Sequence, residues 1–442
     1  MKCGKKNLTT ENVFFGKFKN SFNNNYPVFI IISISLILHF LVLNQLGVNY
    51  TIKSDDLSYI NSGKVFAQTG EITMHGPISA QIMPGLTFLV AFFYLIFGES
   101  QAFMISLKLF WMFMGHATIF TVYKTANMFL NKYLSLIPTV FFLSLDYVWM
   151  NNLILTETPY LLFFSLLVYL TFRLGEDLRL KNYVYLTICY IVAVFFRPNI
   201  GIAPIFIFIY LLSKKHRFLT LLKGGLIAGI VLIMCLLPWT IRNYKIFGDF
   251  IPLTYGVGNP KLLGTYQGYG YPTDEELDYS SLDENISDEM RYYLQNKDEK
   301  PHLTRYYSLE YDDLKAEYRK EHWWNKNKKS MLVSYFYIKP KILLTSTFYW
   351  DEVLGVPLSF IHKFIEVELY ISILALIVIL IRKHKLKETM YLLAVYGSQI
   401  LIYSLTFAFG RYGITMFFLR YLILAIGLSA IFPRSTVGEE KN

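Results

Sequence analysis

The sequence predicts an all-α polytopic membrane protein. We expect a bundle of about 10–12 transmembrane helices, of the length that a bilayer requires, with one extracytoplasmic loop domain. Of the 442 residues, 54% are hydrophobic and 17% are charged, whereas soluble domains carry about 25% charged residues. Apolar stretches near the roughly 20 residues needed to cross hydrocarbon recur along the chain. The alternating pattern typical of membrane β-barrels is not visible.

Each apolar segment is interpreted as a helix, because in lipid only helices and closed barrels satisfy the backbone polar groups. The segments lie at 27–46, 82–97, 103–123, 134–149, 153–172, 182–196, 198–213, 222–243, 360–381, 388–409 and 413–432. The first follows a basic stretch and is too long for a signal-peptide core, which predicts a signal anchor with a cytoplasmic N-terminus. Between 82 and 172 there is one segment too many for the expected topology, so either 134–149 or 82–97 is expected not to cross fully.

The positive charges predict the topology. Lys and Arg gather in the short connections 173–181, 214–223 and 382–387, which the positive-inside rule places in the cytoplasm. The connections 47–81 and 244–340 are then outside. The net charge of +10 follows from these connections and does not indicate nucleic-acid binding.

Four parts result from this topology. The long polar part contains Thr273-x-x-Glu276, the pattern of a helix capping box. Cys3, Cys189 and Cys235 form no disulfide framework. The predicted parts are a cytoplasmic tail 1–26, a transmembrane catalytic module 27–244 that includes the first outer loop 47–81, a loop domain 245–340, and a C-terminal transmembrane module 341–442.

Two adjacent carboxylates, Asp55 and Asp56 in "IKSDDLSYI", follow the first apolar segment on the outer side. They are either solvated loop residues or part of a site, and a site requires cationic partners on the same face. Neighbouring side chains on a helical turn diverge by about 100°, and two ionised carboxylates in one pocket repel. We therefore expect Asp55 to face the site, and Asp56 to face the loop backbone or a cation.

Arginines stand where positive-inside statistics disfavour them. Arg197, Arg242 and Arg411 are predicted at outer helix ends, and Arg420 about halfway into the last segment. An arginine at that depth costs about 2.5–3.5 kcal/mol on insertion scales. Snorkelling to headgroups is the alternative for single residues, but together they favour a phosphate site, because a guanidinium binds phosphate bidentately.

Further polar residues lie near this outer face. Glu157 in "LTETPY" is either a site residue or a favourable charge at a helix start. Lys108 lies early in its apolar segment and could snorkel. His39, His75 and His116 lack metal-ligand spacing, and neither HExxH, CxxC nor a glycine-rich phosphate loop occurs. Nucleotide hydrolysis and a structural zinc site are therefore unsupported.

Several blocks resemble the GT-C superfamily of membrane glycosyltransferases, in the branch of the dolichyl-phosphate-mannose protein mannosyltransferases and the lipid A aminoarabinose transferases. The blocks are "SDDLSYINSGKVFAQTG" (54–70), "MPGLTFLVAFFYLIFG" (83–98), "TETPYLLF" (156–163), "PWTIRNYKIFGDFIPLT" (238–254) and "GRYGITMFF" (410–418). Two positions depart from the pattern of the family. Asp56 stands where Glu is commoner, and Lys108 stands where Arg is usual.

The resemblance implies an inverting transferase that moves a sugar from a polyprenyl-phosphate donor outside the cytoplasm, with Asp55 as general base. It implies catalytic roles near Asp55 for Asp56 and Glu157. The donor phosphate would bind to Lys108, Arg197, Arg242, Arg411 and Arg420, and substrates to Tyr59, His75, Asn243, Tyr244 and Tyr412. The chemistry agrees, since a carboxylate can take the acceptor proton and a phosphate leaving group needs fixed positive charge. A divalent metal at Asp55 and Glu157 stays open, and no cofactor is required.

Two other function classes compete with this interpretation. A lipid or polysaccharide transporter would also have many helices and buried charges, but transporters often show internal repeats, which are not visible here. A non-catalytic subunit of an envelope complex would not need Asp55. The expected partners are the donor, membrane lipids and an acceptor hydroxyl on a protein, glycolipid or surface polysaccharide, and the expected location is the plasma membrane. The sequence does not specify the sugar or the acceptor.

Overall fold

The computed structural model describes residues 10–349 and 352–433, and it is built from helices. Extended pairing in these ranges is confined to one isolated bridge, between Thr73 and Ile78. The α-helices are α1 (Thr10–Leu46), α2 (Asp55–Thr69), α3 (Gly85–Phe97), α4 (Gln101–Ala126), α5 (Ile137–Val140), α6 (Leu145–Met150), α7 (Glu157–Glu176), α8 (Leu180–Phe196), α9 (Ala203–Ser213), α10 (Phe218–Phe247), α11 (Gly258–Gly264), α12 (Ser280–Asn285), α13 (Asp288–Gln295), α14 (Pro301–Val333), α15 (Lys339–Thr345), α16 (Leu358–Arg382), α17 (Leu386–Ser404), α18 (Gly410–Gly413) and α19 (Phe417–Ile431).

Six helical stretches of the described chain are long and apolar enough to cross a membrane. They are Asn25–Leu46, Gln101–Ala126, Glu157–Glu176, Phe218–Phe247, Leu358–Arg382 and Gly410–Ile431, and four shorter apolar helices accompany them. The prediction of an all-α multi-pass membrane protein is therefore confirmed. The long spans are fewer than the 10–12 expected, because several apolar segments form helices that are too short.

One of two segments was expected not to cross fully, and neither of them forms a long helix. The segment 82–97 forms the 13-residue helix α3. The segment 134–149 is not one helix, because it breaks at Ser144, whose backbone is extended with φ −60° and ψ 138°. Asp146 then turns inward, where it accepts a hydrogen bond from the Thr347 hydroxyl at 2.8 Å. The first helix also departs from the prediction, because it begins at Thr10 and contains Pro27.

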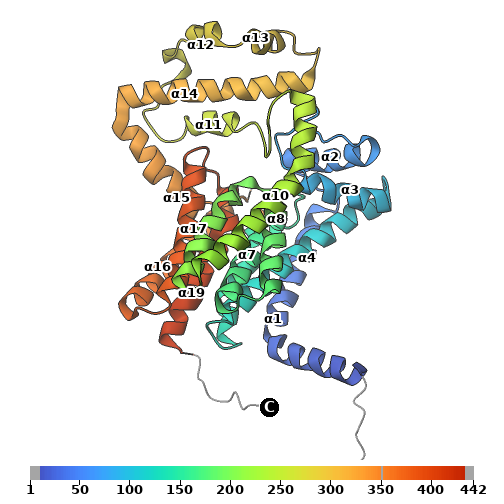
Figure 1. Cartoon of the computed structure of the whole chain (residues 1–442), viewed down its shortest axis with the longest axis vertical. Coiled ribbons are helices and arrows are strands. Elements are labelled where there is room, and N and C mark those ends of the chain that lie inside the picture. The colour runs from blue at the N-terminus through green and yellow to red at the C-terminus, as the bar shows by residue number, and fades with distance from the viewer. Residues whose placement is uncertain (1–9, 350–351, 434–442) are drawn as a thin grey trace, which may run out of the picture.

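The helices differ in how deeply they lie in the bundle. In its most apolar window, α18–α19 is 89% buried, whereas α10 is 11% buried. The C-terminal helix therefore forms the centre of the bundle, and α10 lies at its edge, where its apolar side chains face outward. Figure 1 shows α10 rising from the bundle into the region of α11–α14.

Residues 248–338 form a polar helical unit at one end of the bundle, with α14 lying across it (Figure 1). We call this part the loop unit. The predicted capping box of Thr273 and Glu276 is present, and it starts a single helical turn. Arg319 of α14 is fully buried and donates to the Thr265 hydroxyl at 2.8 Å. Arg319 therefore connects α14 to the end of α11, and buried apolar side chains such as Leu309 and Trp323 pack within the same unit.

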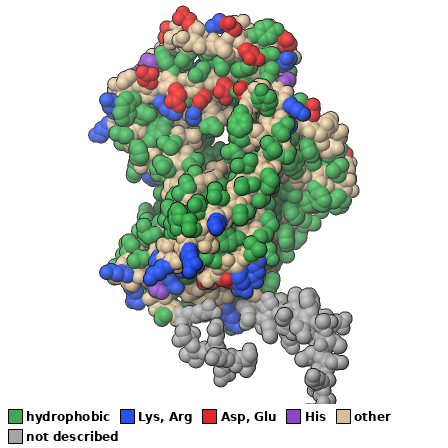
Figure 2. Space-filling view, in the orientation of Figure 1, with side chains coloured by type: hydrophobic (Ala, Val, Ile, Leu, Met, Phe, Trp, Pro, Cys, Tyr) green, Lys and Arg blue, Asp and Glu red, His purple; other side chains and the backbone are tan. Residues whose placement is uncertain are grey.

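The two ends of the molecule carry opposite charge. Figure 2 shows acidic side chains over α12–α14 and a concentration of Lys and Arg at the other end of the bundle. Lys214 and Glu388 form an ion pair of 2.6 Å at that basic end. This distribution agrees with a cytoplasmic basic end and an external loop unit.

Labelling of single cysteines tests this orientation. In a background in which Cys3, Cys189 and Cys235 are all replaced, we expect an impermeant maleimide added to intact cells to label Ser280→Cys. Lys385→Cys should react only after the membrane is opened. Labelling of position 385 but not position 280 in intact cells would reverse the orientation.

Candidate functional site

A cavity of about 310 Å³ lies where the bundle meets the loop unit. Its walls come from the start of α2, the segments before α3 and α11, residues 196–199 at the end of α8, and the end of α17 with the α17–α18 connection. The lining residues are Asp55, Tyr59, Gln81, Ile82, Met83, Thr156, Phe196, Arg197, Pro198, Asn199, Thr254, Tyr255, Gly256, Val257, Pro260, Ile402, Tyr403, Thr406, Arg411 and Tyr412. The cavity thus joins five of the predicted site residues, Asp55, Tyr59, Arg197, Arg411 and Tyr412.

The first helical turn of α2 orients the two adjacent carboxylates differently. Asp56 is buried and accepts hydrogen bonds from the backbone N–H groups of Ile52, Ser54 and Leu57, at 2.7, 3.3 and 2.8 Å. The expectation that Asp56 faces the loop backbone is confirmed. Asp55 is 30% exposed and lines the cavity.

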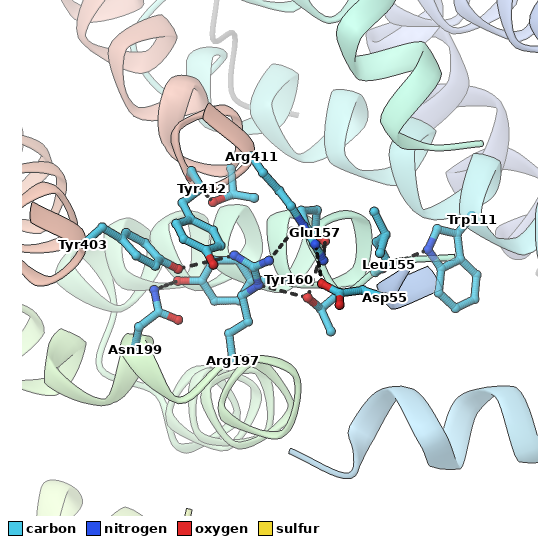
Figure 3. Close-up of polar contacts among 12 residues, drawn as sticks. Asp55, Trp111, Leu155, Glu157, Tyr160, Arg197, Asn199, Tyr403, Arg411 and Tyr412 are labelled. Atoms are coloured by element: carbon cyan, nitrogen blue, oxygen red, sulfur yellow. Dashed lines mark hydrogen bonds and ion pairs between the residues drawn. The ribbon is translucent and has the colours of Figure 1, made fainter. Parts of the chain in front are cut away.

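A buried carboxylate holds two arginines together (Figure 3). Glu157, the first residue of α7, is 0% exposed and is ion-paired with both Arg197 and Arg411. Arg411 also donates from Nη1 to Asp55 Oδ2 at 2.6 Å. One guanidinium therefore links Asp55 of the first loop to Glu157 of α7, and the four groups form a network of two cations and two anions.

Asp55 is ionised in this network. Burial alone would raise the pKa of the Asp55 carboxyl, but a hydrogen bond from His75 and the charge and hydrogen bond of Arg411 hold that pKa below its usual value. His75 Nε2 lies 3.3 Å from Asp55 Oδ1, and its Nδ1 lies 2.9 Å from the Ser58 hydroxyl. Asp55 is therefore an anion at neutral pH, held in place by two donors.

Aromatic rings form the opposite wall. Tyr403 and Tyr412 stack with ring centroids 4.5 Å apart, and the Arg197 guanidinium lies 5.4 Å from the centre of the Tyr412 ring. Arg197 also donates to the hydroxyls of Thr156 and Tyr403, at 3.0 and 3.3 Å. This wall offers flat apolar faces and hydroxyl groups beside a positive charge.

Three of the predicted phosphate ligands are not in the cavity lining. Lys108 is buried and donates to the backbone carbonyls of Tyr50 and Asn152, so it connects the first loop to the segment before α7. Arg242 donates to the carbonyls of Ile72 and Ser79, at 3.3 and 2.9 Å. Lys108 and Arg242 therefore hold the backbone of the first loop in place. Direct binding of phosphate by either residue stays an untested prediction.

Arg420 is the third of them. It is paired with Glu368 of α16 at 2.6 Å, donates to the Leu344 carbonyl at 3.0 Å, and lies over the Phe417 ring. It therefore connects α19 to neighbouring elements inside the bundle. This buried ion pair explains how an arginine is accommodated halfway along the last apolar segment.

The predicted substrate ligands also divide into two groups. Tyr59 and Tyr412 line the cavity, and His75 contacts Asp55. Asn243 is buried and donates to the Ile251 carbonyl at 2.9 Å, and Tyr244 is 60% exposed. Neither of these two lines the cavity, because Asn243 points to the chain that follows α10 and Tyr244 points to the outside of the molecule.

Sequence reasoning missed several polar residues at the site. Asn199 and Gln399 contact each other and Tyr160 beside Arg197. Gln81 lines the cavity and accepts two hydrogen bonds of 3.3 Å from Arg305 of α14. Gln399 could have been noticed in the sequence, because it is a polar residue within the apolar segment 388–409. Gln81 lies in a polar loop, and nothing in the sequence distinguishes it from its neighbours.

The donor set does not fit a divalent metal between Asp55 and Glu157. Both carboxylates face the Arg411 guanidinium, and Glu157 also faces Arg197. In the described ranges, no group of three or more His, Cys, Asp or Glu residues is arranged to hold a metal ion. A cation placed here would have to displace two guanidinium groups.

Removal of the Asp56 charge should act on stability more than on chemistry. We expect Asp56→Asn to lower the free energy of unfolding in detergent by about 1–3 kcal/mol, because an amide cannot accept the hydrogen bonds of all three backbone N–H groups. Its effect on turnover should be smaller than that of the same change at Asp55. A larger loss of turnover per folded molecule at Asp56 would mean that the roles of the neighbours are reversed.

Comparison with known proteins agrees with this architecture. A family model described as dolichyl-phosphate-mannose-protein mannosyltransferase matches residues 79–241. The matched segment contains Glu157 and Arg197, and it leaves Asp55 and Arg411 outside. No curated protein sequence matches the chain.

Two solved structures are similar to the chain. The archaeal oligosaccharyltransferase AglB from Archaeoglobus fulgidus, in complex with an inhibitory peptide and a dolichol-phosphate, matches with a TM-score of 0.50 and 13% identity over 91% of this chain and 50% of that chain. ArnT from Cupriavidus metallidurans, bound to undecaprenyl phosphate, matches with a TM-score of 0.42 and 13% identity over 91% of this chain and 77% of that chain. The chain thus spans half the length of AglB. The predicted resemblance is confirmed at the level of the fold, which the chain shares with the oligosaccharyltransferase AglB, and residues 79–241 match the mannosyltransferase family model.

Proposed function

We propose that this protein is a membrane glycosyltransferase that transfers a sugar from a polyprenyl-phosphate donor to an extracytoplasmic acceptor hydroxyl, with inversion at the anomeric carbon. The observation that carries the proposal is the contact between an ionised Asp55 and Arg411 in a cavity between the bundle and the loop unit. We assign residues 245–340 to an extracytoplasmic domain that covers this cavity.

The residues have separate roles in the proposed reaction. Asp55 takes the proton of the acceptor hydroxyl while the acceptor oxygen bonds to the anomeric carbon and the bond to the phosphate oxygen breaks. Arg197 and Arg411 stabilise the charge that develops on the departing polyprenyl phosphate. Glu157 positions the two guanidinium groups and does not touch the substrate, because it is fully buried beneath them.

Donor binding also activates the base in this scheme. The pKa of Asp55 is held low while Arg411 contacts it, and a carboxylate with so low a pKa is a weak base. The donor phosphate competes with Asp55 for the Arg411 guanidinium. When Arg411 turns toward the phosphate, Asp55 loses a cationic partner and becomes more basic, so proton transfer follows donor binding.

Binding of the carrier lipid tests the phosphate site. We expect Arg411→Ala and Arg197→Ala to weaken the binding of polyprenyl phosphate in nanodiscs by at least about tenfold, since a hydrogen bond to a charged group contributes about 1.5–3 kcal/mol. Lysine at either position should restore part of the affinity. Measurement by native mass spectrometry or by competition with a fluorescent lipid would suffice.

Arg420→Ala is the matched control, because Arg420 is also a buried, ion-paired arginine but lies outside the cavity lining. It should lower stability without changing lipid affinity. Equal weakening by all three alanine variants, or weakening by none, would contradict the phosphate site. A transporter would bind the lipid but would transfer no labelled sugar to any acceptor in the same membranes.

A further inference from the structure

The α17–α18 connection, residues 405–409, is held by two side chains, Gln267 of the loop unit and Lys339 at the start of α15. Gln267 Nε2 donates to the Ala408 carbonyl at 2.7 Å, and the Ala408 N–H donates to Gln267 Oε1 at 2.8 Å. One side-chain amide therefore satisfies both polar groups of one buried backbone residue. This pairing defines the amide orientation, because a flipped amide would place donor against donor and acceptor against acceptor.

Lys339 holds the same connection from the start of α15. Its side chain is fully buried, Nζ donates to the Thr406 carbonyl at 2.9 Å, and Nζ lies 3.5 Å from the centre of the Tyr335 ring. The last residue of α11 closes against the same carbonyl, because a Cβ added to Gly264 would lie 1.9 Å from the Thr406 oxygen. The loop unit therefore contacts this connection at two neighbouring backbone groups.

The connection leads directly to the site. Thr406 lines the cavity, Phe409 is extended with φ −134° and ψ 137°, and α18 then begins at Gly410 with Arg411 as its second residue. Only Phe409 and Gly410 separate Ala408, whose backbone Gln267 holds, from Arg411, whose guanidinium contacts Asp55 and Glu157. A change in the Gln267 contact is therefore transmitted over a short and mostly buried stretch of chain.

We infer that Gln267 is a positioning residue of the loop unit: by holding the backbone of Ala408, it sets the place of Arg411 against Asp55 and so couples the loop unit to the proposed transfer reaction. This inference rests on the proposed function for its effect on turnover. Its structural part, the hold on residues 405–412, does not depend on what the protein catalyses. Lys339 supports the same connection through Thr406.

Two measurements test the inference on the full-length protein in proteoliposomes. Gln267→Leu keeps the approximate size of the side chain and removes both hydrogen bonds. We expect faster hydrogen–deuterium exchange in residues 405–412. Turnover of a polyprenyl-phosphate-linked sugar that the wild-type protein transfers should fall about tenfold, as a small misplacement of a catalytic group predicts. Asn285→Ala is the control, because Asn285 is exposed and its amide donates to the local Ser281 carbonyl.

The pH profile separates positioning from loss of fold. Asp55 is faced by Arg411, His75, Tyr59 and Tyr412. If Arg411 is displaced in the free enzyme, Asp55 loses part of the interaction that keeps it ionised, so the acidic limb of the kcat/KM profile should move upward by about one pH unit. A simple decrease in the amount of folded protein lowers the whole profile and leaves this limb in place.

The outcomes separate the inference from the proposed function. Wild-type exchange and an unshifted acidic limb in folded Gln267→Leu would overturn the inference. If that variant does not fold, Gln267→Glu keeps the acceptor for the Ala408 N–H and should show an intermediate effect, and wild-type behaviour there would overturn it equally. If the wild-type protein transfers no sugar, the proposed function fails, and the exchange of residues 405–412 alone decides whether Gln267 holds Arg411's segment.

Discussion

Replacement of Asp55 by asparagine is expected to reduce sugar transfer at least about 100-fold, the lower end of what a general base contributes. Asparagine keeps the size of the side chain and can still accept a hydrogen bond from Arg411, but it cannot take the acceptor proton. Binding of polyprenyl phosphate should be retained, because Arg411 is then freed from one of its two anionic partners. Transfer of radiolabelled sugar by the purified variant, normalised to folded protein, measures the effect.

The wild-type pH profile provides a second check on Asp55. Because the pKa of Asp55 is held below its usual value, the ionised base is present at every pH above that lowered value. In the profile of kcat/KM, which reports the free enzyme, activity should therefore persist on the acidic side until the pH falls below about 3.9, the ordinary aspartate pKa. The acidic limb of kcat, which reports the donor complex, should lie at higher pH, because Arg411 has then turned to the phosphate. Near wild-type turnover in Asp55→Asn would exclude Asp55 as the base.

Replacement of Glu157 by glutamine should have the largest effect on stability. Glu157 is fully buried and compensates two guanidinium groups, and breaking a buried ion pair by removing one partner costs about 3–5 kcal/mol. Turnover per folded molecule should also fall, by up to about 100-fold, because Arg197 and Arg411 lose their common orienting group. Thermal unfolding in detergent and transfer assays on the surviving folded fraction measure the two effects.

Glu368→Gln is the matched control for Glu157→Gln. Glu368 is also buried and paired with an arginine, Arg420, but this pair lies outside the cavity lining. The control should lose a comparable amount of stability and keep its turnover per folded molecule. If both variants lose turnover equally, Glu157 acts only through stability, and if Glu157→Gln unfolds like the wild type, the buried network does not have the assigned role.

The segments of the transmembrane bundle could be predicted from hydrophobicity, because a helix that faces lipid must be apolar over a length set by the bilayer. The same criterion failed inside the bundle. The segment 134–149 has the composition of a spanning helix, but it breaks at Ser144 because Asp146 finds a buried partner in Thr347. Composition records the average environment of a segment, and it does not record which polar residue will find a partner.

For the site, the sequence by itself determined which charged residues would be costly to bury without a partner. Adjacent acids after the first apolar segment and arginines in apolar surroundings are unfavourable without partners, and Asp55, Arg197 and Arg411 do meet at one cavity. Only the tertiary structure decided which partner each one has. The burial of the Arg420 charge is compensated by Glu368, and that of Lys108 and Arg242 is compensated by backbone carbonyls. The reason is physical: desolvation of a charge depends on local depth, which hydropathy reports, whereas its compensation depends on residues brought close by folding from distant parts of the chain.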